Sequence, residues 1–157
     1  MEHCSNTALF MEKFRLLLEN GEELALPVQG NSMVPFLVNR RDTVWLRKPA
    51  KPLKVGDIVL YQRENGQYIL HRIHSIQADS FTLVGDAHQV LEPGVRREQI
   101  FGRVTRVYRK GKTVGPDSFC WKFFAVVWIR MIRLRPTAMR VYGWAKKIFG
   151  GNNESIK

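Results

Sequence analysis

The sequence has little of what stabilises small extracellular domains or crosses a membrane. Among its 157 residues there are two cysteines, Cys4 and Cys120, and no C-x-x-C pair. Two thiols cannot form a disulfide framework and no zinc-binding spacing is present, which favours a reducing compartment. The longest apolar run, residues 119–132, contains Lys122 and Arg130. It therefore falls short of the roughly 20 apolar residues that a membrane-spanning helix needs.

Residues 1–20 also lack the unbroken apolar core of a secretory signal, because they carry Glu2, Glu12 and Glu19. We therefore expect a protein that is cytoplasmic or peripheral on the inner face of a membrane. Hydrophobic residues make up 45% and charged residues 25% of the chain, which is a globular composition and excludes fibrous and wholly disordered classes. The length suits one domain with appended helices.

Acidic residues are nearly missing from the C-terminal third. Residues 1–100 hold 12 Lys/Arg and 12 Asp/Glu, whereas residues 101–149 hold 12 Lys/Arg and only Asp117, a net charge of +11. A neutral body with a basic extension predicts an anionic partner, either lipid headgroups or nucleic acid. Because no helix-turn-helix or ribonucleoprotein motif accompanies the charge, we expect no nucleic acid.

Residues 1–23 predict a helical segment, with Phe10, Phe14 and Leu17 at helical spacing over residues 6–20. Residues 24–113 predict a mostly β domain, a coiled sheet or barrel, because short runs rich in β-branched and aromatic residues alternate with turn signals. The expected strands are 43–46, 57–61, 68–76, 81–84 and 101–108. The dipeptide Asn65-Gly66 predicts a hairpin between two of them.

Residues 114–149 predict a pair of basic amphipathic helices divided at Pro136, and residues 150–157 a flexible tail. On a helical wheel the cations Lys122, Arg130 and Arg133 fall within an arc of about 80°, and apolar residues occupy the remaining positions. Such helices are typical of interfacial membrane segments. The candidate membrane-binding residues are Trp121, Lys122, Trp128, Arg130, Arg133 and Trp144. The alternative is a helical hairpin that packs on the β domain with its basic face in water.

Three short motifs bear chemistry. The stretch Gly30-Asn31-Ser32-Met33-Val34-Pro35 places a serine after a flexible glycine, where a backbone amide can bind an oxyanion. Strand alternation places His71 on the same face as Ile69 and Ile73. A Gly85-Asp86 turn follows the strand at residues 81–84. Taken singly, each motif is common in turns and cores.

Together with residues 55–61, 70–73 and 101–104, these motifs resemble, in order and spacing, the type I signal peptidases, whose clan includes the self-cleaving LexA-type repressors. The resemblance spans about residues 26–110. It implies the clan's mostly β peptidase fold and a serine endopeptidase that cleaves a leader or signal-like peptide near a membrane, without cofactor or metal. His71 stands where bacterial enzymes and repressors carry lysine, so the chain resembles the endoplasmic-reticulum, archaeal and sporulation-type enzymes.

By that resemblance Ser32 is the nucleophile, His71 the general base and Asp86 the acid that orients the imidazole, while Glu92 matches a second, accessory acid of the family and is the alternative partner of His71. Many signal peptidases carry a Ser or Thr hydroxyl two residues before the nucleophile, where this chain has a glycine. The expected oxyanion and substrate-binding residues are Gly30, Asn31, Met33 and Pro35. His88 is the rival base.

Two other classes fit parts of the sequence. The clan's β domain can serve as a non-catalytic or regulatory module that docks on a membrane or a protein partner. A self-cleaving regulator would need a DNA-binding head, and residues 1–25 hold at most one helix. The sequence does not indicate an oligomeric state.

Overall fold

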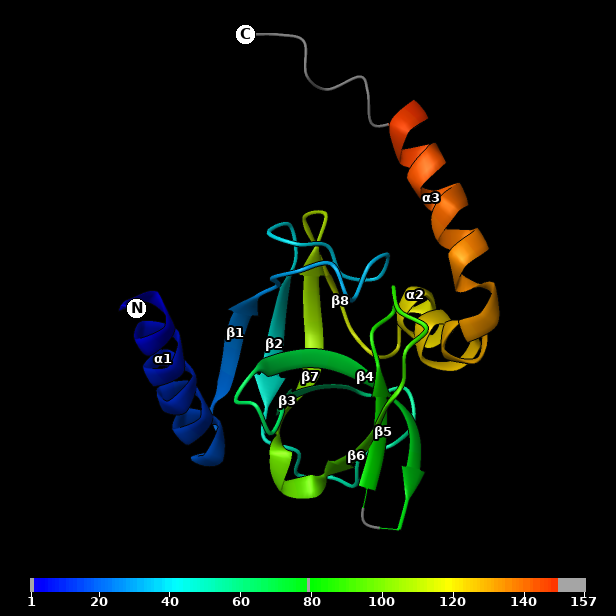
Figure 1. The fold of residues 1–157 in the computed structure, drawn as a ribbon. Helices are drawn as coiled ribbons and strands as arrows, with labels where there is room; N and C mark the ends of the chain where they lie inside the picture. Colours follow the sequence, from blue (N-terminus) through cyan, green and yellow to red (C-terminus); the bar gives the residue numbers. More distant parts are fainter. Residues whose placement is uncertain (1, 79, 150–157) are drawn as a thin grey trace, which may run out of the picture.

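The computed structural model describes residues 2–78 and 80–149, and the tail expected over residues 150–157 lies outside them. A helix, α1 (Glu2–Glu19), precedes the β domain, and a helical segment follows it (Figure 1). The strands are β1 (Glu23–Pro27), β2 (Thr43–Arg47), β3 (Ile58–Gln62), β4 (Tyr68–Gln77), β5 (Ser80–Val84), β6 (Glu92–Arg96), β7 (Ile100–Arg109) and β8 (Lys112–Val114). The mostly β fold with helices at both ends is confirmed.

The strands form one antiparallel sheet in the order β1-β2-β7-β3-β4-β5-β6, with β8 paired to β7. The sheet coils upon itself, so β3 to β7 surround an apolar centre (Figure 1). The hairpin expected at Asn65-Gly66 joins β3 to β4, and Gly66 there has a φ of 84°. Residues 92–94, which have the composition of a turn, instead begin β6, and this places Glu92 on a strand beside β5.

The helix α1 packs on the sheet with a face shifted from the expected one. Met11, Phe14 and Leu18 are buried in the main core, whereas Phe10 and Leu17 are largely exposed. All five positions are apolar, so spacing alone could not decide which stripe of the helix meets the sheet.

The C-terminal segment folds back against the β domain. It comprises α2 (Phe119–Lys122), a π-helical turn η2 (Phe123–Val127), the 3-10 turns η3 (Trp128–Arg130) and η4 (Ile132–Leu134), and α3 (Arg135–Phe149). A further 3-10 turn, η1 (Arg97–Gln99), lies within the β domain, between β6 and β7. Pro136 lies in the first turn of α3, where its missing N–H costs nothing. None of the described helices is long and apolar enough to cross a membrane.

Two of the expected membrane-binding residues are buried. Trp121 is 6% exposed and packs edge-on against Phe36, and Trp128 is 7% exposed and packs against Phe124. Their side chains complete the main core, so neither can enter lipid, and this part of the prediction is wrong. Trp144 is 65% exposed, and the cations Lys122, Arg130 and Arg133 are exposed as well.

Candidate active site

Ser32 lies in the long connection between β1 and β2. Gly30 has a φ of 80°, a left-handed conformation that favours glycine, and the chain then turns so that Met33 and Phe36 enter the main core. Ser32 itself is half-buried. A polar serine is therefore held at the surface by buried neighbours on its C-terminal side.

The loop that follows β5, residues 85–88, lies directly against this serine. The Ala87 N–H donates to the Ser32 carbonyl at 2.8 Å. A Cβ atom at Gly85 would stand 2.6 Å from the Ser32 carbonyl oxygen, 3.0 Å from His71 Nε2 and 3.2 Å from His88 Nδ1. Position 85 therefore requires glycine. The backbone of Ser32 and the ring of His71 both lie against the Cα of this glycine, on the side where a side chain would stand.

His71 comes from the middle of β4, opposite Val59 of β3, and is 3% exposed. Its Nδ1 lies 3.3 Å from Glu92 Oε1 and 3.4 Å from the Tyr61 hydroxyl. Glu92 begins β6, so β3, β4 and β6 together enclose the imidazole.

These contacts determine the tautomer of His71. The Tyr61 hydroxyl donates to Glu92 Oε2 at 2.6 Å, so it can only accept from His71. Both neighbours of Nδ1 are thus acceptors, and Nδ1 carries the proton. The lone pair of the neutral ring is therefore on Nε2, the atom beside Gly85 and the Ser32 carbonyl.

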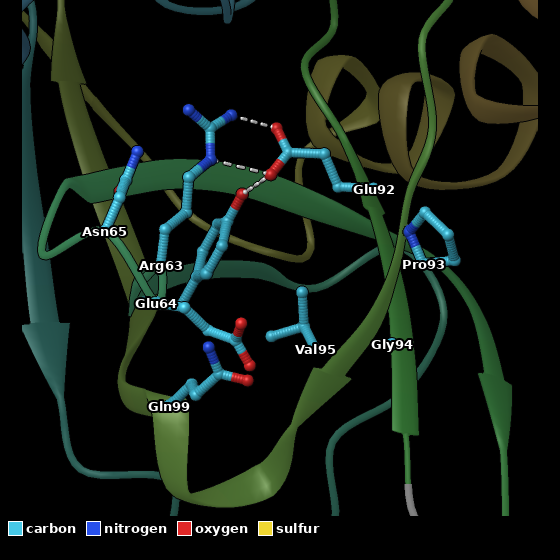
Figure 2. A pocket seen from close by; sticks show the side chains of 9 residues that line it. Arg63, Glu64, Asn65, Glu92, Pro93, Gly94, Val95 and Gln99 are labelled. Atoms are coloured by element: carbon cyan, nitrogen blue, oxygen red, sulfur yellow. Dashed lines mark hydrogen bonds and ion pairs between the residues drawn. The ribbon is translucent and has the colours of Figure 1, made fainter.

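Glu92 also forms a two-pronged ion pair with Arg63, the residue that follows β3 (Figure 2). Burial alone would raise the pKa of Glu92, but the hydrogen bonds from Arg63 and Tyr61 outweigh burial and lower it. Burial and the Glu92 hydrogen bond raise the pKa of Tyr61. Near neutral pH Glu92 is therefore ionised and Tyr61 keeps its proton.

Burial lowers the pKa of His71 from 6.5 to about 4. The charge of Glu92 opposes this effect, whereas His88 and Arg63 add to it. The ring is consequently neutral near pH 7, and its Nε2 can accept a proton without first having to lose one.

Asp86 does not take the expected position at the imidazole. Its carboxylate accepts two hydrogen bonds from Arg72, at 3.0 and 2.8 Å, and both side chains are fully buried. Arg72 also donates to the Gly56 carbonyl at 2.9 Å. Arg72 follows His71 on β4 and points to the opposite side of the strand, so the pair ties the 85–88 loop to the strand that carries His71.

A groove of about 720 Å³ runs past the serine. Its lining residues are Gln29, Gly30, Asn31, Ser32, Val34, Val38, Ile69, Ala87, His88, Met139 and Tyr142. Met139 and Tyr142 belong to α3, which the sequence predicted either to bind a membrane or to pack on the β domain, without a role at the site. The expected residues Met33 and Pro35 are not among the lining side chains; Met33 is buried in the core and Pro35 is half-buried.

His88 faces the groove as an exposed side chain, and its ring stands perpendicular to that of His71 with centroids 6.0 Å apart. No acid contacts His88 among the described residues, so only His71 has an orienting partner. Within residues 2–78 and 80–149 no group of three His, Cys, Asp or Glu side chains is arranged to hold a metal ion.

The coiled antiparallel sheet holds Ser32 at an open groove, with the His71 ring against Gly85 of the neighbouring loop, and a serine near an imidazole is the arrangement that serine peptidases use. The sequence matches the family model described as Peptidase S24-like over residues 5–105. The chain therefore belongs to the S24-like peptidase family. Comparisons with curated proteins and with solved structures gave no match.

The two carboxylates should respond differently to neutralisation. Asp86→Asn leaves the Arg72 guanidinium buried without its counter-charge, which costs about 3–5 kcal/mol of unfolding free energy. Glu92→Gln should cost much less, because Glu92 and Arg63 are partly exposed. Urea unfolding of both variants measures the difference, with the exposed Glu64→Gln as control. Equal losses at positions 86 and 92 would contradict the assignment of Asp86 to a buried structural pair.

Proposed function

We propose that the protein is a serine endopeptidase in which Ser32 is the nucleophile and His71 the general base, with Glu92 orienting the imidazole. The observation that carries the proposal is the position of His71 Nε2. Its lone pair lies beside the Ser32 backbone across Gly85, while Nδ1 is fixed by Glu92. The carboxylate assigned here is Glu92, because Asp86 is engaged by Arg72.

In the proposed reaction, His71 Nε2 takes the proton of Ser32 Oγ as this oxygen attacks the carbonyl carbon of the scissile peptide bond. The Ser32 amide and the Asn31 side chain are the donors that we assign to the resulting oxyanion. The C–N bond then breaks and His71 passes its proton to the leaving amine. Water, deprotonated by the same imidazole, hydrolyses the acyl ester and returns Ser32 to its starting state.

The base that we assign is histidine, although a lysine would serve the same reaction. Among the described residues that line the groove there is no lysine, whereas two imidazoles face the point beside the Ser32 carbonyl. A lysine needs strong desolvation to lose its proton near neutral pH, but a buried imidazole is already neutral there. These features support the histidine-base variety of the clan, and the open groove suits an extended leader-like peptide.

A fluorophosphonate probe should label Ser32, because the activated hydroxyl attacks phosphorus as it would a carbonyl carbon. Ser32→Ala should remove the label, and Ser5→Ala should leave it unchanged. Mass spectrometry of the modified peptide identifies the site. Labelling at another residue, or none with the folded wild type, would contradict the proposal and favour a non-catalytic module.

The activity should depend on pH through His71. Because burial lowers the pKa of His71 to about 4, the basic form is already present near neutral pH. As the pH rises, kcat/KM should increase with a midpoint below 6.5 and reach a plateau by about pH 7. Steady-state cleavage of a peptide-library hit measures this profile.

His71→Ala should abolish cleavage, whereas His88→Ala should keep the activity. Its acid limb should move slightly to higher pH, because His88 lowers the pKa of His71. If kcat/KM continued to increase above pH 8, a lysine would be the general base instead of His71.

We further propose that the enzyme works at an anionic membrane surface, through the outer face of its C-terminal segment. Large apolar side chains are exposed there beside cations of the same helices. These residues are Phe119, Lys122, Val126, Val127, Arg130, Arg133, Leu134, Arg140, Val141 and Trp144. Phe119 is 85% exposed. Apolar side chains among basic ones are the composition of an interfacial helix, and the cytoplasmic leaflet carries the matching charge.

Neutralising Lys122, Arg130 and Arg133 together to glutamine should weaken binding to vesicles that contain phosphatidylglycerol. Each cation near an anionic surface contributes about 1 kcal/mol, so the loss should be on the order of a hundredfold. Vesicle sedimentation measures it. The matched control neutralises Lys48, Lys51 and Lys54, which are exposed on the β domain. Equal weakening in both variants would mean that only the net charge matters, and the docking face would be wrong.

A further inference from the structure

The first residue of α3, Arg135, is buried against the loop that carries Gly85. It is 1% exposed. Its Nη1 donates to the carbonyl of Gly85 at 2.8 Å and to the carbonyl of His88 at 2.7 Å. One guanidinium group therefore holds both ends of the 85–88 loop, and a second nitrogen, Nη2, lies 3.3 Å from the carbonyl of Trp128.

The remaining carbonyl on this side of the loop is held by the same segment. Trp128 Nε1 donates to the Asp86 carbonyl at 2.9 Å, and the Arg135 guanidinium lies over the indole ring. Three of the four loop carbonyls, those of residues 85, 86 and 88, thus accept hydrogen bonds from Trp128 or Arg135.

The fourth loop residue, Ala87, connects the restrained loop to the proposed nucleophile, Ser32. Ala87 points its N–H at the Ser32 carbonyl, and Gly85 closes against His71 Nε2. A displacement of the loop would therefore move Ser32 relative to the base and open the imidazole to water. Arg135 touches neither the reacting serine nor the histidine, and it lies beyond the region 5–105 that defines the family.

We propose that Arg135 is a positioning residue of the active site, which sets the distance between Ser32 and His71 by clamping the carbonyls of Gly85 and His88. The proposal rests on the catalytic roles assigned above to those two residues. The planar guanidinium suits this task, because its donors point in fixed directions and its charge strengthens each bond to a carbonyl. A lysine carries the same charge, but on a flexible stem.

An arginine with a purely structural role can be distinguished from a positioning residue by the effect of its removal. Loss of a structural arginine would lower stability without altering the chemistry of His71. If Arg135 positions the loop, its loss lets water reach His71, and the effect of burial on the pKa is relaxed. The groups that face the imidazole from the sheet stay in place: Tyr61 of β3, Arg63 directly after β3, and Glu92 of β6. His88 moves with the loop, and because it lowers the pKa of His71, its displacement raises that pKa in the same direction.

The test compares Arg135→Met and Arg135→Lys with Arg47→Met, which removes an exposed cation at the end of β2, outside both proposed surfaces. In folded Arg135→Met, kcat should fall roughly a hundredfold, the scale expected when reacting groups are misplaced by about 1 Å, and KM should change little. The acid limb of the pH profile should move toward 6.5. Arg135→Lys should recover part of kcat, and Arg47→Met should match the wild type.

A second measurement is independent of catalysis. In the Ser32→Ala background, NMR titration of the His71 ring should show a higher pKa in Arg135→Met, and a smaller rise in Arg135→Lys. A folded Arg135→Met with unchanged His71 titration and unchanged kcat would overturn the proposal. If Arg135→Met does not fold, Arg135→Lys provides the test: an unchanged His71 pKa together with an unchanged kcat in that variant would overturn the proposal. A raised His71 pKa in an otherwise unreactive protein would support the clamp and refute the peptidase mechanism instead.

Discussion

The candidate site depends on one close approach between two irregular segments, the Ser32 turn and the 85–88 loop. Neither segment belongs to a strand ladder, so their separation is determined by a single backbone hydrogen bond, from Ala87 to Ser32, and by the missing side chain of Gly85. Such loops hold their geometry only when rigid neighbours over-determine it. Here β4 supplies one restraint through the Arg72–Asp86 pair, and the same strand carries His71. His71, the base that we propose, and the loop beside it are therefore both anchored to β4.

Two pairs of a carboxylate and a guanidinium serve different purposes because they are buried to different extents. Arg72 and Asp86 are fully enclosed and satisfy each other, so their charges have no capacity left for chemistry. Glu92 is partly exposed and shares its oxygens among Arg63, Tyr61 and His71. Because Arg63 offsets much of its charge, Glu92 does not reverse the effect of burial on the imidazole. His71 then rests in the neutral form, and its interaction with Glu92 strengthens when the ring gains a proton, as a base in catalysis requires.

Much of the fold followed from local patterns, whereas the partners within the site did not. Alternation and the Asn65-Gly66 turn located the central strands, but β6 was hidden by Pro93 and Gly94, which are turn residues in most settings. The choice between Asp86 and Glu92 depended on which side of β4 each carboxylate meets, and that follows from the coiling of the sheet. Similarly, a helical wheel shows that Trp128 lies on an apolar face, but not whether protein or lipid covers it. Arg135 gave no signal at all, because nothing local marks an arginine for burial.

The C-terminal segment has two faces with different requirements. Its inner face supplies Trp128 to the Asp86 carbonyl and Arg135 to the Gly85 carbonyl, which also accepts from the His88 N–H. A buried carbonyl left without a donor costs free energy that a small domain cannot easily absorb. The segment and the site therefore form one cooperative unit. Its outer face carries the exposed apolar and basic side chains. A surface that binds there alters catalysis only if it binds one arrangement of the segment more tightly than another. If the inner contacts hold the segment in one arrangement, the membrane binding that we propose would act solely as a tether, which raises the local concentration of enzyme and substrate.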